Sequence, residues 1–306
     1  MFIVKYRKIF YAISVLLVVA SIASLSIWGL KLGIDFKGGT SITFQYPTER
    51  PSIEAVKGKI DTLQVSPAIS GTYSLVPYGP TGYVLKTRNL SEPERALIMG
   101  AIQSNTAEKV EFKKVNTIGP TLGKTSANKA LVSVVLVLIC IVLFITFAFR
   151  KVSKPVSSWK YGLVSVLALS HDVIIPMGLF AVLGHYLGYE VDTLFVTAIL
   201  VILGFSIHDT IVVFDRTREN LKNNRGDKSA KSFETIVGES INQTFTRSLN
   251  TSLTTLLAIL MVFLFGPEAT KNFSLVLLVG VFFGTYSSIF IASNLLVTIE
   301  KFQKKA

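Results

Sequence analysis

ALVSVVLVLICIVLFITFAF, residues 130–149, carries no charged side chain and is long enough to cross a membrane as a helix. About 20 predominantly apolar residues suffice for that crossing. Similar apolar stretches occur elsewhere, at residues 9–30, 161–183, 194–214, a segment ending near Phe265, and 273–299. The 306-residue chain is 50% hydrophobic and only 16% charged, with a mean hydropathy of +0.53. We therefore predict a polytopic α-helical membrane protein with six transmembrane helices.

The first apolar stretch follows Lys5, Arg7 and Lys8, as the apolar part of a secretory signal peptide would. It is longer than the roughly 7–15 apolar residues of such a signal. We therefore expect an uncleaved membrane anchor.

The basic residues predict the orientation of the chain, because short loops rich in lysine and arginine stay in the cytoplasm. With six spans, four basic segments fall on one side of the membrane. Their members are Lys5, Arg7, Lys8, Arg150, Lys151, Lys154, Lys160, Arg216, Arg218, Lys222, Arg225, Lys228, Lys231, Lys301, Lys304 and Lys305. We expect both termini in the cytoplasm. This pattern also explains the net charge of +12 without nucleic acid, which we do not expect as a partner.

Residues 31–126 have the mixed polar and apolar composition of a soluble domain. We expect this domain to separate the first transmembrane helix, in residues 1–30, from the other five, in residues 127–306. Helical patterns begin at Pro51 and at Ser91, where Glu94 completes a capping box; the second extends to about Thr106. The expected strands are 40–46, 72–76, 83–87 and 109–115. The order β-α-β-β-α-β is that of a ferredoxin-like α+β domain, which would lie in the periplasm.

Several motifs that suggest other functions fail on inspection. GPTLGKT, residues 119–125, has one residue too few between its glycines for a phosphate-binding loop. Cys140 is the single cysteine, so no disulfide or cysteine-rich metal site is expected. No nucleophile, base and orienting group are clustered, and no metal-ligand spacing occurs. We expect neither an enzyme nor a bound cofactor.

Three ionisable residues inside the spans are candidates for function, because such groups are costly in a membrane. If the fourth span ends near Asp215, Asp209 lies roughly 9 Å inside the membrane from the cytoplasmic end. If the fifth begins near Ser240, Arg247 lies roughly 10 Å inside from the same side. This matching depth predicts a pair, either a proton relay or a permanent structural ion pair. Asp172, about 18 Å deep, extends the relay or bonds neighbouring helices.

The fifth span also carries a predicted polar stripe, which must face a bundle interior or a hydrated cavity. Its members besides Arg247 are Gln243, Thr244, Asn250, Thr251, Thr254 and Thr255. His171 and His208 adjoin the two acids and are able to titrate, although we expect packing roles. At the membrane edge we expect ordinary salt bridging among Asp215, Arg216, Arg218 and Glu219.

The motifs together resemble one family over essentially the whole chain. They are GIDFKGG (33–39), IGPT (118–121), SHD (170–172), GFSIHDTIVVFDRTREN (204–220), NQTFTR (242–247) and NTSLTT (250–255). In this order they are similar to the SecF family of protein-export membrane proteins, within the RND superfamily. The family-motif positions outside the spans are Gly33, Asp35, Gly38, Gly39, Gly119, Pro120, Asp215, Arg216, Arg218 and Glu219. SecD shares the glycine motif but has a much larger extracytoplasmic region.

The resemblance implies a subunit of the bacterial inner membrane that assembles with SecD and works with SecYEG and YajC. It implies that the proton motive force, not ATP, promotes export of unfolded preproteins on the periplasmic side, with Asp209 and Arg247 as the intramembrane acid and arginine. His208 departs from the family's usual asparagine. A chaperone-like Sec subunit without proton conduction, a small-molecule RND exporter, and sodium in place of protons stay open as alternatives.

Overall fold

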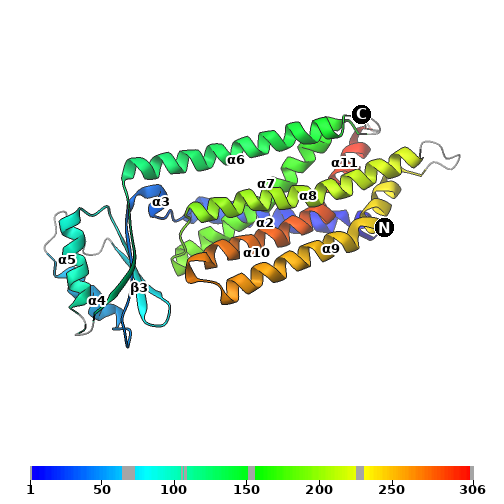
Figure 1. The fold of residues 1–306 in the computed structure, drawn as a ribbon. Helices are drawn as coiled ribbons and strands as arrows, with labels where there is room; N and C mark the ends of the chain where they lie inside the picture. Colours follow the sequence, from blue (N-terminus) through cyan, green and yellow to red (C-terminus); the bar gives the residue numbers. More distant parts are fainter. Residues whose placement is uncertain are drawn as a thin grey trace. The chain divides into compact units, whose positions relative to one another are not determined.

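The computed structural model describes residues 2–63, 73–104, 106, 109–150, 156–224 and 231–303. The chain divides into two units (Figure 1). One, here called the helix unit, comprises residues up to 31 and from 132 onward; the other, the α+β unit, comprises residues 32–131.

Six helical runs in the described residues are long and apolar enough to cross a membrane, which confirms the predicted number. Five are α2 (Arg7–Trp28), α6 (Pro120–Ala148), α7 (Ser158–Leu187), α8 (Thr193–Asn224) and α9 (Phe233–Phe265). The sixth combines η1 (Glu268–Thr270), α10 (Lys271–Ser287), the π-helical turn η2 (Ser288–Ala292) and α11 (Ser293–Gln303). A short helix, α1 (Phe2–Lys5), precedes them.

Helices α8 and α9 extend well beyond the expected membrane boundaries. The fourth span is expected to end near Asp215, but α8 continues as a helix to Asn224; α9 begins at Phe233 and not near Ser240. Ser232 caps α9 by accepting a hydrogen bond from the Thr235 amide at 3.2 Å. Likewise α6 begins at Pro120, a residue favoured in the first helical position. The basic residues Lys151, Lys154, Arg225, Lys228, Lys304 and Lys305 lie outside the described residues.

Small residues allow the helices of the helix unit to approach closely, as is common in membranes. A Cβ added at Gly178 of α7 would lie 2.3 Å from Ser21 Cβ of α2. At this contact the Ser24 hydroxyl donates to the Gly178 carbonyl at 2.9 Å. On α10, a Cβ at Gly284 would lie 3.1 Å from Ser206 Cβ of α8. These contacts bring the backbones of α2 and α7, and of α8 and α10, together.

The α+β unit has the predicted ferredoxin-like fold, with an antiparallel sheet in the order β2-β3-β1-β4. Its strands are β1 (Gly39–Gln45), β2 (Ser74–Tyr78), β3 (Gly82–Thr87) and β4 (Glu111–Ile118). Helices α4 (Ile53–Asp61) and α5 (Glu92–Gln103) contribute Val56, Ile60, Ile98 and Ile102 to a shared core with Ile42, Phe44 and Leu85 of the sheet. Both helices therefore cover the same face.

Most element boundaries in this unit shift by a few residues from the expected ones. Helix α4 begins at Ile53, because Ser52 is its cap and accepts from the Ala55 amide at 3.2 Å. The predicted capping box of Ser91 and Glu94 is confirmed, although α5 ends at Gln103 and not near Thr106. β4 continues to Ile118. Thr72, the expected start of the second strand, lies outside the described residues.

The glycine motif of residues 33–39 forms a tight corner within the α+β unit. Gly33 precedes the short helix α3 (Ile34–Lys37), which has Asp35 in its first turn. Gly38 and Gly39 have φ of 79° and 140°, a region that side chains disfavour. A Cβ at Gly38 would lie 2.8 Å from Pro120 Cα, and one at Gly39 would lie 2.5 Å from the Thr87 carbonyl oxygen. The glycine motif and the motif that contains Gly119 and Pro120 are therefore in contact at Gly38 and Pro120.

Candidate functional site in the membrane helices

Asp209 lies on α8 and is buried between membrane helices. Its Oδ1 accepts a hydrogen bond from the Ser248 hydroxyl of α9 at 2.7 Å. Its Oδ2 is also buried, and among the residues that the structure describes it has no hydrogen-bond partner. An ionised oxygen without a donor in such surroundings is unfavourable, so this oxygen can take up a proton or a cationic group.

Arg247, the predicted partner of Asp209, does not pair with it in this structure. Both residues are described, yet no hydrogen bond or ion pair joins them. Asp209 accepts its hydrogen bond from Ser248 instead. Successive residues of a helix differ by about 100° in direction. The Arg247 side chain therefore leaves α9 on a different side from Ser248, and it is exposed. His208, next to Asp209, is exposed as well.

The polar residues of α9 form two rows rather than the single stripe predicted. The exposed row contains Gln243, Arg247, Asn250, Thr251 and Thr254, while Thr255 is partly buried. The Thr251 hydroxyl bonds the Arg247 carbonyl of its own helix at 2.9 Å, and Thr254 and Thr255 bond α9 in the same way. Gln243 accepts hydrogen bonds from Arg216 at 2.6 Å and Asn220 at 2.9 Å, both on α8.

The second row of α9, here called the hydroxyl row, is buried and consists of Ser240, Thr244, Ser248 and Ser252. Thr244 therefore belongs here and not with the exposed row. The hydroxyl row links α9 to two neighbours, because Ser240 accepts from Asn220 of α8 at 2.9 Å and Ser252 from Thr285 of α10 at 2.7 Å. The regular spacing of four residues was visible in the sequence, but serines are easily overlooked beside an arginine and an asparagine.

Asp172 lies fully buried on α7 and bonds two neighbouring helices. Its Oδ2 accepts from Ser206 of α8 at 2.5 Å and from Ser287 of α10 at 2.7 Å. Its Oδ1 lies 2.9 Å from the Nδ1 of His171. Pro176 follows four residues later and has no N–H to bond the Asp172 carbonyl. Asp172 thus fixes the place where α7, α8 and α10 meet.

A series of hydroxyl groups lies between the two acids. The Ser288 hydroxyl bonds the Ser206 carbonyl at 3.3 Å and lies 2.8 Å from the Thr210 hydroxyl. Ser206 contacts Asp172, and Thr210 directly follows Asp209 on α8. Ser288 is also the first residue of the π-helical turn η2, an irregularity that is frequent at functional sites. These hydroxyls were not predicted from the sequence, although the adjacent serines Ser287 and Ser288 interrupt an otherwise apolar span.

The C-terminal part of α8 carries the charged motif residues Asp215, Arg216, Arg218 and Glu219. Arg216 Nη1 lies 2.6 Å from Glu219 Oε2, and Arg218 Nη1 lies 3.8 Å from Asp215 Oδ1. The predicted salt bridges are therefore present. Among the described residues, no group of three histidine, cysteine or carboxylate side chains is arranged to hold a metal ion.

Comparison with known proteins shows the family to which this chain belongs. Residues 98–302 match the model of the protein export membrane protein SecD/SecF C-terminal domain, and residues 24–46 match that of the SecD/SecF GG motif. The protein translocase subunit SecF of Thermobaculum terrenum is 39% identical, over 97% of this chain and 93% of that protein. The chain belongs to the SecF family. The SecF subunit of Anaerolinea thermophila is 34% identical over 96% of this chain.

Solved structures of SecDF share the fold of this SecF family member. The crystal structure of SecDF, a translocon-associated membrane protein from Thermus thermophilus, aligns with a TM-score of 0.81 at 30% identity over 97% of this chain. A SecDF structure in the super-membrane-facing form aligns with a TM-score of 0.67. This chain spans 38% of the length of each of those SecDF chains.

Proposed function

We propose that this SecF family member works with SecD as a membrane subunit that uses the proton motive force, without ATP, to promote export of unfolded preproteins. In this proposal it lies in the bacterial inner membrane with both termini in the cytoplasm, and the α+β unit handles preprotein in the periplasm. Membership of the SecF family and the names of its relatives support the assignment.

The observation that carries the proposal is the half-satisfied carboxylate of Asp209. One oxygen is held by Ser248, and the other is buried with no partner among the described residues. A proton delivered to this oxygen removes the charge. When the proton leaves, the ionised acid attracts the guanidinium of Arg247, which directly precedes Ser248 on α9. Alternation between these states would shift α9 against α8 and so convert proton flow into movement.

The exposed row of α9 supports an assembly with SecD. Arg247 and Asn250 are exposed on a helix that spans the membrane. Lipid tails cannot satisfy their hydrogen-bonding groups, whereas polar side chains of another membrane protein can. We assign this face, with the neighbouring His208, to the membrane helices of SecD. In the proposed assembly SecYEG and YajC lie beyond SecD.

The α+β unit offers an open sheet face for preprotein. Helices α4 and α5 cover one face, and strand alternation directs Thr43, Val84 and Lys114 to the other. These three residues are paired across β1, β3 and β4. A mixed apolar and polar surface of this kind suits transient contact with extended chains of many sequences.

Preprotein translocation into inverted membrane vesicles tests the proposal. Asp209→Asn keeps the volume of the protonated acid, so the complex should assemble normally and lose stimulation by a proton gradient. Asp215→Asn, an exposed acid on the same helix, serves as the matched control and should keep stimulation. If only a sodium gradient stimulates translocation by the wild type, the coupling ion is sodium and not the proton. Full stimulation of Asp209→Asn by either gradient would support the alternative of a structural subunit.

A further inference from the structure

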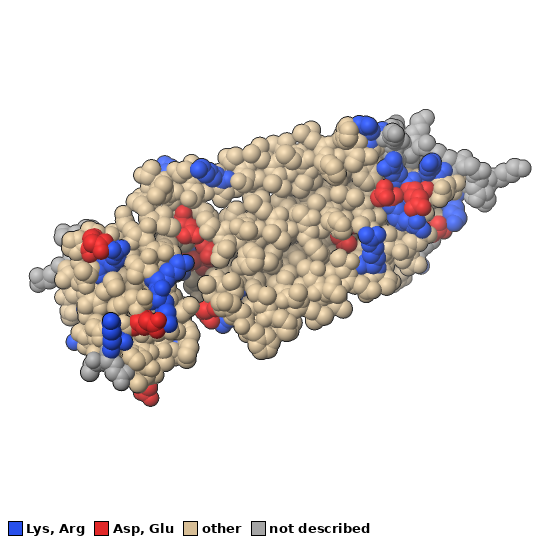
Figure 2. All heavy atoms as spheres, viewed as in Figure 1, with Lys and Arg blue, Asp and Glu red and all other residues tan. Residues whose placement is uncertain are grey.

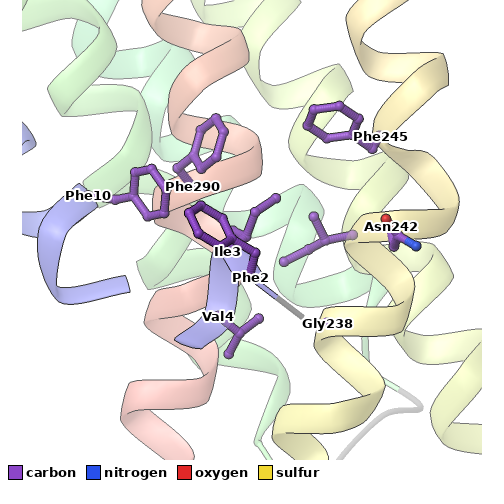
Figure 3. A pocket seen from close by; sticks show the side chains of 9 residues that line it. Phe2, Ile3, Val4, Phe10, Gly238, Asn242, Phe245 and Phe290 are labelled. Carbon is purple, nitrogen blue, oxygen red and sulfur yellow. The ribbon is translucent and has the colours of Figure 1, made fainter. Parts of the chain in front are cut away.

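An apolar pocket of about 440 Å³ lies in the helix unit, between the start of the chain and α9 (Figure 3). Phe2 and Phe10 line it from α1 and α2, and Phe290 lines it from η2. Ile241, Asn242 and Phe245 line it from α9. Figure 3 shows Phe10 beside Phe290 across the space from Phe245 and Asn242. Asn242 is the polar side chain among these lining residues.

A charged junction lies next to this pocket, at the start of α9. Glu234 bonds Arg7 of α2 at 2.7 Å and also pairs with Lys301 of α11. Ile241, Asn242 and Phe245 follow Glu234 by seven, eight and eleven residues, so they share its face of the helix. The charged junction thus precedes the apolar pocket along α9, and Arg7 also donates a hydrogen bond to the carbonyl of the lining residue Val4. A charged group followed by an apolar space matches the polarity of a lipid molecule.

The segment beside the pocket has an excess of positive charge. Lys5 and Lys8 are exposed and lie between the lining residues Phe2 and Phe10 along the chain. Arg7 and Lys301 both pair with Glu234, so Lys5 and Lys8 are the exposed positive charges of this segment. Figure 2 shows Lys and Arg, together with Asp and Glu, gathered at one end of the helix unit. Basic pockets between membrane helices on the cytoplasmic side are typical sites for anionic lipid headgroups.

We propose that this pocket holds one acyl chain of an anionic phospholipid, whose headgroup lies at Lys5 and Lys8. The hydrocarbon would contact Phe10, Phe245 and Phe290, and the Asn242 amide would lie at the ester region. Phe245 and Arg247 are two positions apart and so project from nearly opposite sides of α9. The lipid pocket is therefore separate from the face that we assign to SecD, and its occupancy does not depend on proton coupling.

Native mass spectrometry of the full-length protein, purified with its partner, tests the site. Phosphatidylglycerol and phosphatidylcholine with the same acyl chains are added in turn. We expect wild type to retain one phosphatidylglycerol through increasing collisional activation and to lose phosphatidylcholine. Ile241→Trp and Phe245→Trp fill the pocket, so bound phosphatidylglycerol should disappear. Leu257→Trp, at an exposed apolar position on the same helix, should retain it.

A second set of variants tests the headgroup contact. Lys5→Gln/Lys8→Gln should weaken phosphatidylglycerol binding by roughly 25-fold, about fivefold for each lysine, without affecting phosphatidylcholine. Lys222→Gln/Lys231→Gln removes the same charge from the last turn of α8 and from the residues before α9, and should leave binding unchanged. Gel filtration and circular dichroism identify variants that fail to fold. Equal retention of both lipids, unchanged binding by the two tryptophan variants, or crosslinking of Asn242→Cys to a partner chain would overturn the proposal.

Discussion

The Ser248 hydroxyl donates a hydrogen bond of 2.7 Å to Asp209 Oδ1 and so joins α9 to α8 inside the membrane. Arg247, one residue earlier, is exposed. The acid and the arginine are thus held apart in this conformation by a neutral hydroxyl. In the proposed cycle this is one of two states, and the other has Arg247 at the free oxygen of Asp209.

Ser248→Ala removes the hydrogen bond and leaves both Asp209 oxygens without a donor among the described residues. We expect the free energy of unfolding to fall by about 1–3 kcal/mol, the usual cost of an unsatisfied buried polar group. Thermal unfolding in detergent measures this loss. Ser248→Thr keeps a hydroxyl and should behave nearly as wild type. An unchanged melting temperature for Ser248→Ala would show that the bond contributes nothing to stability.

Substitutions of Arg247 separate a switching role from a structural one. In the chain by itself Arg247 is exposed and not paired with Asp209, so Arg247→Met should change the stability of the isolated chain by no more than about 0.5 kcal/mol. The same variant should lose gradient-stimulated export, whereas Arg247→Lys keeps the charge and should be partly active. A large fall in melting temperature with stimulation intact would favour a structural pair.

Features encoded by neighbouring residues were predictable from the sequence. The six apolar runs and the Ser91 capping box depend on hydropathy and on contacts three residues apart, and both are present. The partner of Asp209 was not predictable in this way. It depends on how α9 is rotated about its axis, and a change of one residue, from Arg247 to Ser248, corresponds to about 100°.

The ends of α8 and α9 show a second limit of sequence reasoning. The apolar run ends near Asp215, but the helix continues to Asn224, with Arg216 and Glu219 paired on its surface. A membrane boundary and a helix boundary are different quantities. The contact of Asp172 with Ser206 and Ser287 joins three separate helices and was likewise inaccessible from local patterns.

Gly178→Ala tests the close approach of α2 and α7. The new Cβ would lie 2.3 Å from Ser21 Cβ, so one helix must move. We expect a loss of about 1–3 kcal/mol in unfolding free energy, as for other overpacked sites. Gly204→Ala on α8 is the matched control, because nothing lies within 4 Å of its Cβ position. Addition of Ser21→Gly should restore part of the stability, and failure of any rescue would place the damage elsewhere.

The stability of the α+β unit should depend on pH through Glu94. Hydrogen bonds from Arg88, at 2.5 Å and 3.3 Å, and from the Ser91 amide, at 2.7 Å, lower the pKa of Glu94 from 4.5 to about 2. Since the folded pKa is below the unfolded one, the stabilisation is fully present above pH 4.5 and is lost as the pH falls toward 2. Amide hydrogen exchange of α5 in the full-length protein should accelerate over that range.

Glu94→Gln should already show faster exchange at the start of α5 at neutral pH, because the neutral amide binds Arg88 weakly and cannot complete the same charged capping box. In this variant, amide exchange of α5 should also accelerate less than in wild type as the pH falls from 4.5 toward 2, because the variant has no carboxylate at residue 94 to protonate. Glu92→Gln, in the same turn but paired with Arg95, controls for removal of one acidic side chain from the helix start. If wild type and Glu94→Gln respond alike between pH 4.5 and 2, another carboxylate controls the acid response of this unit.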